Sequence, residues 1–414
     1  MNSQDMVHYS NAYELDMSCK NQICRNVGWW HEVLDAHHPR LKCILPIYDI
    51  LIASVMMRGL ENPATACHLS CPILLLAYTM TSLAEAIISA APLRPESPLL
   101  QSLAALLQEL LVDDKKEDPV DPSDFYQSVG KVLRIRVHAL GDAISSLMKL
   151  LDFLRGCDPV IGECIEKALY SGRCSNMMLG KRYDPNSQVL CIRKKWGKEK
   201  ALDVPFRVAC ASIDEQISDA SLYHALKQSL SPRPLRGYKW SGDFEETTES
   251  VAVDAEKDID DENEWNTSRR LAIRRLPPYW LLHVDHFSST NAYTRPQSKR
   301  RSCSIPLTLN ADFVYGYEQN EDLPTYHLTG GILHLSNDDV EDDEEDGHYV
   351  SIVKSQIGDT WTLIDDSKLI EVSEDTCLSL LAGCQSSLSE NGTYMQACLV
   401  VYRLCSATED IELA

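Results

Sequence analysis

The chain has 414 residues, 44% of them hydrophobic and 24% charged, and its formal net charge at pH 7 is -22. This composition excludes a chain that is disordered throughout, and the length allows two or three domains or one large domain with insertions. Most of the charge lies in two acidic runs, residues 243–264 with eleven acids and one Lys, and residues 338–346 with eight acids and no base. Because phosphate binding needs a basic face, we expect no nucleic-acid partner.

The cysteines number fifteen, an odd count, and no two of them form a Cys-x-x-Cys pair. The start from Met1 to Ser10 lacks the basic and apolar regions of a signal peptide. These features predict reduced, mostly buried thiols in a cytoplasmic or nuclear protein. They indicate no zinc site with paired Cys ligands, so we expect no metal and no cofactor.

The first part of the chain is predicted to be mainly helical. Residues 1–58 show no clear repeat and are interpreted as a partly helical N-terminal extension. Beyond them, apolar residues at intervals of three and four, together with a Ser-Asp cap, predict helices at 73–88, at 99–111, from near Phe125, and at 143–154.

One uncharged stretch, residues 63–84, is long enough to cross a bilayer. Its first half is polar and contains Pro72, and Glu85 follows it directly. We therefore interpret the stretch as a buried helix and expect no membrane partner.

After about residue 171 the pattern changes to short strands and turns, with one helix at 222–230. The strands are predicted at 189–193, 206–209, 271–274, 279–284, 327–335, 349–353, 361–364 and 397–403. Helices followed by a largely antiparallel sheet indicate the α+β class. The acidic run 243–264 is predicted to be a disordered loop within the strand region.

A hairpin near the carboxy terminus carries a candidate base. Residues 347–353 alternate as a strand, residues 356–359 form a turn, and residues 361–366 return. A turn centred on residues 357 and 358 places Asp365 within a residue or two of His348, so a carboxylate could orient the imidazole as in a catalytic triad. Taken by itself, a His that opens a strand beside an Asp is more often an ordinary polar strand edge than a catalytic pair.

Cys67 is the candidate nucleophile, because it directly precedes the long apolar helix. A thiol at a helix amino terminus is exposed to the positive end of the helix dipole, which favours the thiolate. His348 could complete the activation. The alternative is that Cys67 is simply one more buried cysteine.

Whole segments favour the catalytic interpretation. Gly59-Leu-Glu-Asn-Pro-Ala-Thr-Ala-Cys67-His-Leu-Ser resembles the cysteine box of the ubiquitin-specific proteases, Gly-Leu-x-Asn-x-Gly-Asn-Thr-Cys-Tyr-x-Asn-Ser. Gly347-His-Tyr, followed by Trp361 and Ile364-Asp-Asp-Ser-Lys, resembles the histidine box of that family. Segments between and after the boxes are similar in the same order, so the resemblance covers about residues 59–403.

The resemblance implies a papain-like cysteine protease fold with a helical thumb and antiparallel-sheet fingers and palm. It divides the chain into the extension 1–58, a catalytic domain 59–405 with a thumb of about 59–170 and fingers and palm of about 171–405, and a tail 406–414. The two acidic runs, 243–264 and 338–346, become insertions in that domain.

The resemblance also implies a deubiquitinase that cleaves the isopeptide or peptide bond after the carboxy-terminal glycine of ubiquitin, with ubiquitin or ubiquitinated proteins as partners. Cys67 falls on the nucleophile, His348 on the general base and Asp365 on the orienting acid. Asp366 falls on the neighbouring second acid, and Asn62 on the side chain that helps to form the oxyanion hole.

Several residues depart from the family pattern. Ala64-Thr-Ala replaces Gly-Asn-Thr, His68 replaces Tyr, and Gly141 stands where the family has Gln. The Cys pairs that bind zinc in the fingers are absent. These departures motivate two alternatives: a catalytically weak or inactive ubiquitin-binding scaffold, and a protease that acts on a ubiquitin-like modifier.

Overall fold

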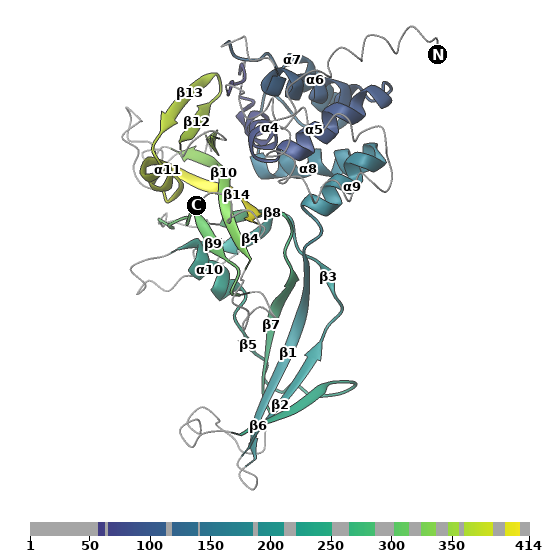
Figure 1. Cartoon of the computed structure of the whole chain (residues 1–414), viewed down its shortest axis with the longest axis vertical. Helices are drawn as coiled ribbons and strands as arrows, with labels where there is room; N and C mark the ends of the chain where they lie inside the picture. The colour runs from purple at the N-terminus through teal and green to yellow at the C-terminus, as the bar shows by residue number, and fades with distance from the viewer. Residues whose placement is uncertain are drawn as a thin grey trace, which may run out of the picture.

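The computed structural model describes residues 57–62, 65–112, 118–139, 141–184, 189–210, 221–250, 265–285, 302–313, 324–336, 347–355, 360–383 and 394–405. The predictions for residues 1–56, for the acidic residues 251–264 and 338–346, and for the tail 406–414 lie outside these ranges. In the described part of the chain, helices precede largely antiparallel sheets, which confirms the α+β class (Figure 1).

The helical part comprises α4 (Cys67–Thr79), α5 (Thr81–Ala90), η2 (Ala91–Leu93), α6 (Pro98–Val112), α7 (Ser123–Val132), α8 (Ala143–Cys157) and α9 (Pro159–Ala168). The helices predicted at 99–111, near Phe125 and at 143–154 are confirmed. The helix α9 was not predicted, although its start carries a recognisable signal. Asp158 caps it by accepting from the N–H of Val160 at 2.8 Å, and Pro159 occupies the first helical position.

The prediction of one helix over residues 73–88 is wrong. The helix α4 ends at Thr79, and α5 starts at Thr81 with its axis bent by 100°. Met80 between them has φ -118° and ψ 50°, outside the helical region. The Thr79 hydroxyl donates to the Leu75 carbonyl at 2.6 Å, a side-chain bond that bends helices.

Among the described residues, no single helix is both long and apolar enough to cross a membrane. The bent pair formed by α4 and residues 81–93 passes that test by length and composition together. Every residue of α4 is buried in the protein, so within the stretch 63–84 the interpretation as a buried helix is confirmed for Cys67–Thr79.

A long six-stranded sheet extends away from the rest of the molecule (Figure 1). Its strands run in the order β5-β7-β1-β2-β6, and β3 pairs with β1: β1 (Arg173–Asp184), β2 (Val189–Trp196), β3 (Lys200–Ala201), β5 (Arg233–Pro234), β6 (Glu245–Ser250) and β7 (Asn266–Arg275). The prediction of a disordered loop over 243–264 is wrong for residues 245–250. They form β6, where Glu246 pairs with Arg193 of β2 through a 2.9 Å ion pair.

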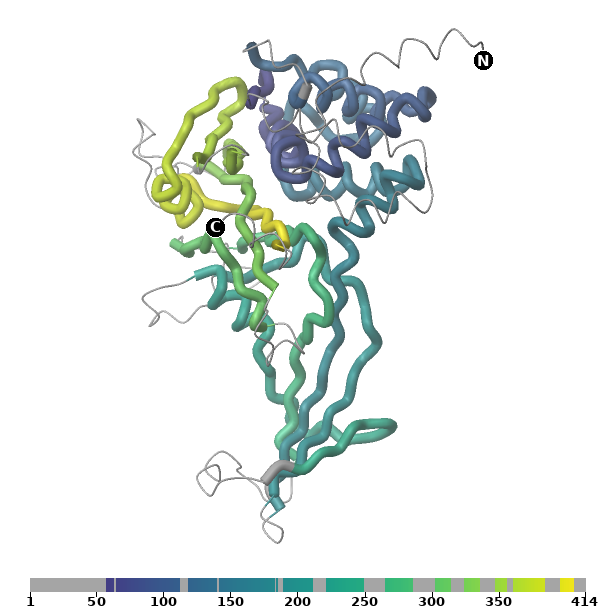
Figure 2. Tube along the Cα trace, viewed as in Figure 1, coloured from purple at the N-terminus to yellow at the C-terminus, as the bar shows by residue number. Residues whose placement is uncertain are grey.

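The second sheet has eight strands in the order β13-β12-β11-β10-β14-β8-β4, with β9 paired to β10. Among the strands that the structure describes in this sheet, only β4 and β8 pair in parallel. The last strand, β14, lies inside this sheet between β10 and β8 (Figure 2). The elements are β4 (Phe206–Ala209), α10 (Leu222–Ser229), β8 (Tyr279–Asp285), β9 (Thr308–Asn310), β10 (Thr325–Ser336), β11 (His348–Lys354), β12 (Trp361–Asp365), β13 (Lys368–Val372), α11 (Glu374–Leu381) and β14 (Tyr394–Cys405).

Both faces of the second sheet are buried. Successive residues of one strand point to opposite faces. In β10, Ile332 therefore joins a core with the helical part, whereas Leu333 joins a second core that includes residues of α10 and α11. Val353 and Ile352 of β11 divide in the same way. The helices thus pack directly on β10 and β11, and this packing brings the start of α4 to the start of β11.

Candidate active site

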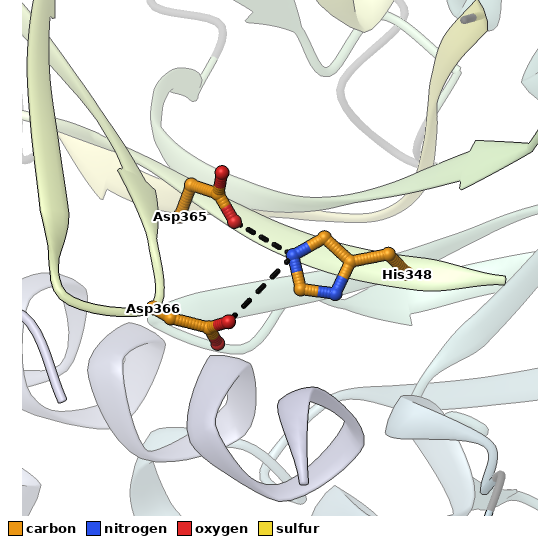
Figure 3. A group of neighbouring side chains, drawn as sticks. All are labelled: His348, Asp365 and Asp366. Carbon is orange, nitrogen blue, oxygen red and sulfur yellow. Dashed lines mark hydrogen bonds and ion pairs between the residues drawn. The ribbon is translucent and has the colours of Figure 1, made fainter. Parts of the chain in front are cut away.

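One half of the site is the hairpin of β11 and β12. Ser351 pairs with Ile364, which is the register predicted from the sequence. The Nε2 atom of His348 lies 2.7 Å from Oδ1 of Asp365. The Oδ2 atom of Asp366 lies 3.9 Å from the same nitrogen (Figure 3). Asp365 therefore makes the hydrogen bond, and Asp366 lies just beyond bonding distance.

The turn between β12 and β13 is fixed to the segment that precedes α4. Asp366 in this turn has φ +53°, a left-handed conformation that Asp tolerates better than most residues. Its carbonyl oxygen accepts from the N–H of Leu60 at 3.0 Å. A Cβ at Gly59 would lie 2.3 Å from that oxygen, so only glycine allows this approach.

The other half of the site is the start of α4. Cys67 is the first residue of the helix, and Ala66 before it offers no side-chain cap. The positive end of the helix dipole therefore favours an anion at this point. Cys67 lies within hydrogen-bonding reach of the His348 ring. Since Asp365 holds Nε2, the nitrogen left for the thiol is Nδ1.

Asn62 bridges the two halves. Its Oδ1 accepts from the N–H of Ala66 at 3.1 Å, and its side chain lies beside the carboxyl group of Asp366, whose pKa it lowers. Sequence reasoning missed this bridge, because nothing in the spacing of the two residues predicts it. The structure thus brings together all five residues singled out in the sequence: Asn62, Cys67, His348, Asp365 and Asp366.

Comparison with known proteins agrees with this geometry. A family model described as ubiquitin carboxyl-terminal hydrolase matches residues 58–402. The chain belongs to this family. The family match spans all five site residues.

Two solved structures similar to this hydrolase are of the SAGA DUB module Ubp8/Sgf11/Sus1/Sgf73. The structure bound to ubiquitin aldehyde has a TM-score of 0.57 and 14% identity, covering 89% of this chain and 75% of that chain. The structure bound to monoubiquitin has the same TM-score and identity, with 88% and 74% covered. These similarities confirm the predicted papain-like fold. Comparison with curated proteins gives no significant match.

The charged groups of the hydrolase site favour a protonated histidine. The hydrogen bond with Asp365, followed by the one with Cys67, raises the pKa of His348 to about 10. The same bond lowers the pKa of Asp365. Burial raises the pKa of Asp366, although its hydrogen bond with Asn62 opposes that effect. The arrangement suits an imidazolium that faces a thiolate.

We expect the His348–Asp365 pair to stabilise the fold most at mildly acidic pH. A histidine pKa that folding raises contributes fully below the unfolded value of about 6.5, and the contribution is lost as the pH rises towards the folded value of about 10. The lowered pKa of Asp365 has the opposite sign, so its contribution is lost only as the pH falls below about 4.

Urea unfolding of the wild type and of His348→Ala measures this contribution. The stability difference should shrink between about pH 5.5 and about pH 9.5. The control is His138→Ala, which removes an exposed histidine and should show no such trend. A difference that stays constant over this range would contradict the assignment.

The same three side chains are the ones that could hold a cation in the described part of the chain. Ligand atoms of His348, Asp365 and Asp366 lie within 4.8 Å of one another. The 2.7 Å hydrogen bond accounts for the closeness of the first two. The donor set therefore needs no ion to explain its geometry.

Proposed function

We propose that this chain is an active cysteine-type deubiquitinase that hydrolyses the isopeptide or peptide bond after the carboxy-terminal glycine of ubiquitin. The observation that carries the proposal is the meeting of Cys67 with the hydrogen-bonded pair His348 and Asp365 at the start of α4. Membership of the family and the ubiquitin present in the similar SAGA DUB structures support ubiquitin as the partner.

In the first chemical step the Cys67 sulfur attacks the glycine carbonyl as a thiolate. The carbonyl oxygen becomes an oxyanion in the tetrahedral intermediate, and the amino terminus of α4 favours negative charge beside it. His348 holds the proton and gives it to the departing amine as the carbon–nitrogen bond breaks. The product of this step is a thioester between Cys67 and ubiquitin.

Water hydrolyses the thioester in the second step. The neutral His348 left by the first step takes a proton from the attacking water, and Asp365 stabilises the imidazolium that forms again. The carbon–sulfur bond breaks, which releases the ubiquitin carboxylate. Cys67 returns to the thiolate, paired with protonated His348.

Asn62 is proposed to donate to the oxyanion. Its side-chain oxygen accepts from the N–H of Ala66, which leaves its amide N–H groups, beside Asp366, to donate to the substrate. We expect Asn62→Ala to lower kcat by about 10²-fold, as for other single oxyanion donors. Steady-state hydrolysis of ubiquitin–aminomethylcoumarin measures the effect. The control is Asn176→Ala, an exposed position on β1, and equal kcat values for the two variants would remove Asn62 from the mechanism.

A suicide probe tests the proposed activity directly. Ubiquitin bearing a carboxy-terminal propargyl group should form a covalent adduct with the wild-type chain. Denaturants should not break this adduct. A folded chain that binds ubiquitin but forms no adduct would instead be a ubiquitin-binding scaffold. Adducts with probes built on a ubiquitin-like modifier, and none with ubiquitin, would indicate the other alternative.

The cellular compartment is a further proposal. The fifteen cysteines without a Cys-x-x-Cys pair support a reducing setting, the cytoplasm or the nucleus. In the described part of the chain the cysteines are free thiols. Fluorescence imaging of a tagged chain tests this assignment, and accumulation in the secretory pathway would contradict it.

A further inference from the structure

His68, the residue after the nucleophile, is a buried imidazole that the proposed mechanism does not use. Its side chain and backbone are 1% exposed. The Nδ1 atom lies 3.2 Å from the carbonyl oxygen of Thr65. A carbonyl only accepts, so Nδ1 must carry the hydrogen, and the neutral ring then has its lone pair on Nε2. The Nε2 atom is buried and has no hydrogen-bond partner.

Gly141 provides the surface on which this ring packs. A Cβ at residue 141 would lie 2.4 Å from Cδ2 and 2.7 Å from Nε2 of His68. Any other residue at 141 would therefore displace the imidazole. Both residues differ from the family pattern, which has Tyr at the position of His68 and Gln at the position of Gly141. The two residues that depart from the pattern therefore contact each other.

The environment keeps the ring neutral. Burial lowers the pKa of His68, although the Thr65 carbonyl and the charge of Asp142 oppose that effect. Asp142 is itself engaged as the cap of α8, where its Oδ1 accepts from the N–H of Ser145 at 2.6 Å. An imidazolium would have to bury an N–H at Nε2 against Gly141 with no acceptor.

The ring also links the nucleophile to the base. On one side it holds Thr65, two residues before Cys67. On the other side it packs on the segment that enters α8, and Ala143, the first residue of that helix, lies beside the hydroxyl of Tyr349. Tyr349 is the neighbour of His348 in β11. The contact between His68 and Gly141 therefore lies between the two segments that must be in register for catalysis.

We propose that His68 is a positioning residue for the deubiquitinase reaction, fixing the loop that presents Cys67 through its hydrogen bond to Thr65 and its packing on Gly141. The inference rests on the proposed function. A displacement of about 1 Å at a reacting group can cost about 10²-fold in rate. We therefore expect His68→Ala to lower kcat by about 10- to 100-fold, with KM for ubiquitin–aminomethylcoumarin changed less than about twofold.

The test is a double-mutant cycle between the two residues. Gly141→Ala alone should lower kcat about as much as His68→Ala, because its methyl group displaces the ring. In the His68→Ala background the methyl group enters the space that the ring has left, so the double variant should be no worse than His68→Ala. Effects that multiply in the double variant would overturn the proposal. The exposed His138→Ala is the matched control.

Rescue by a similar donor separates positioning from simple packing. His68→Asn places an amide N–H near the position of Nδ1 and should be several-fold more active than His68→Ala, while equal activity would overturn the role of the hydrogen bond. If the alanine variant fails to fold, His68→Asn and the ¹⁵N shifts of the wild-type ring still decide, since the proposal requires an unprotonated Nε2.

A wild-type chain that the ubiquitin probe does not label would contradict the proposed function. A labelled wild type with an equally fast His68→Ala would contradict only this inference.

Discussion

Cys67→Ala is expected to reduce hydrolysis of ubiquitin–aminomethylcoumarin by about 10⁴-fold or more. Cys67 supplies the sulfur within hydrogen-bonding reach of His348. Without that sulfur no thioester forms, and the oxyanion site and the ubiquitin surface can provide only residual catalysis. The covalent adduct with the propargyl probe should vanish, while the affinity for ubiquitin itself remains.

The matched control is Cys157→Ala at the end of α8. This cysteine is half-buried, and its thiol donates only to the carbonyl of Leu154. Its removal should leave both the turnover and the adduct unchanged. An adduct that persists in Cys67→Ala would mean that another thiol is the nucleophile, and mass spectrometry of the labelled peptide would identify it.

Asp365→Asn should also have a large effect, a fall in kcat of about 10³- to 10⁴-fold, as for other orienting acids of catalytic triads. The carboxylate accepts from Nε2 of His348 at 2.7 Å and is the main reason that the pKa of this histidine is raised. An amide at this position no longer stabilises the imidazolium. The pKa of His348 should therefore fall, and NMR titration of the ring measures that shift independently of turnover.

Asp366→Asn is the informative comparison, because its carboxylate lies 3.9 Å from the same nitrogen. We expect a loss of only about tenfold, since a charge beyond hydrogen-bonding distance contributes a weaker electrostatic term. The new amide oxygen can still accept from the neighbouring Asn62 side chain. A larger loss in Asp366→Asn than in Asp365→Asn would reverse the roles of the two acids.

Local sequence patterns determined much of this fold. Apolar residues at intervals of three and four located α6 and α8. Alternating apolar residues located the bounds of β4, β8, β11 and β12 to within one or two residues. The hairpin register followed from the position of its turn, which alone placed Asp365 next to His348. These features depend on residues close together in the chain, so a local pattern contains the information.

Other elements are determined by their neighbours. The strand β1 has no alternation of apolar residues, yet it pairs with β2 on one side and β7 on the other. The strand β6 lies in an acidic run, and its pairing with β2 sets Glu246 against Arg193. In both cases the partner strands supply hydrogen bonds and charge that outweigh a weak local preference.

By itself, the sequence determined the identity of the reacting groups, because the ordered resemblance to the family boxes selected Cys67, His348 and Asp365, whose local spacing alone left other interpretations open. Only the tertiary structure decided how these groups meet. Packing of α4 on β10 and β11 brings the Cys67 segment and the His348 segment together. The same packing places His68 on Gly141. Contacts of this kind depend on the shapes of surfaces that pack from remote parts of the chain, and no local pattern encodes those shapes.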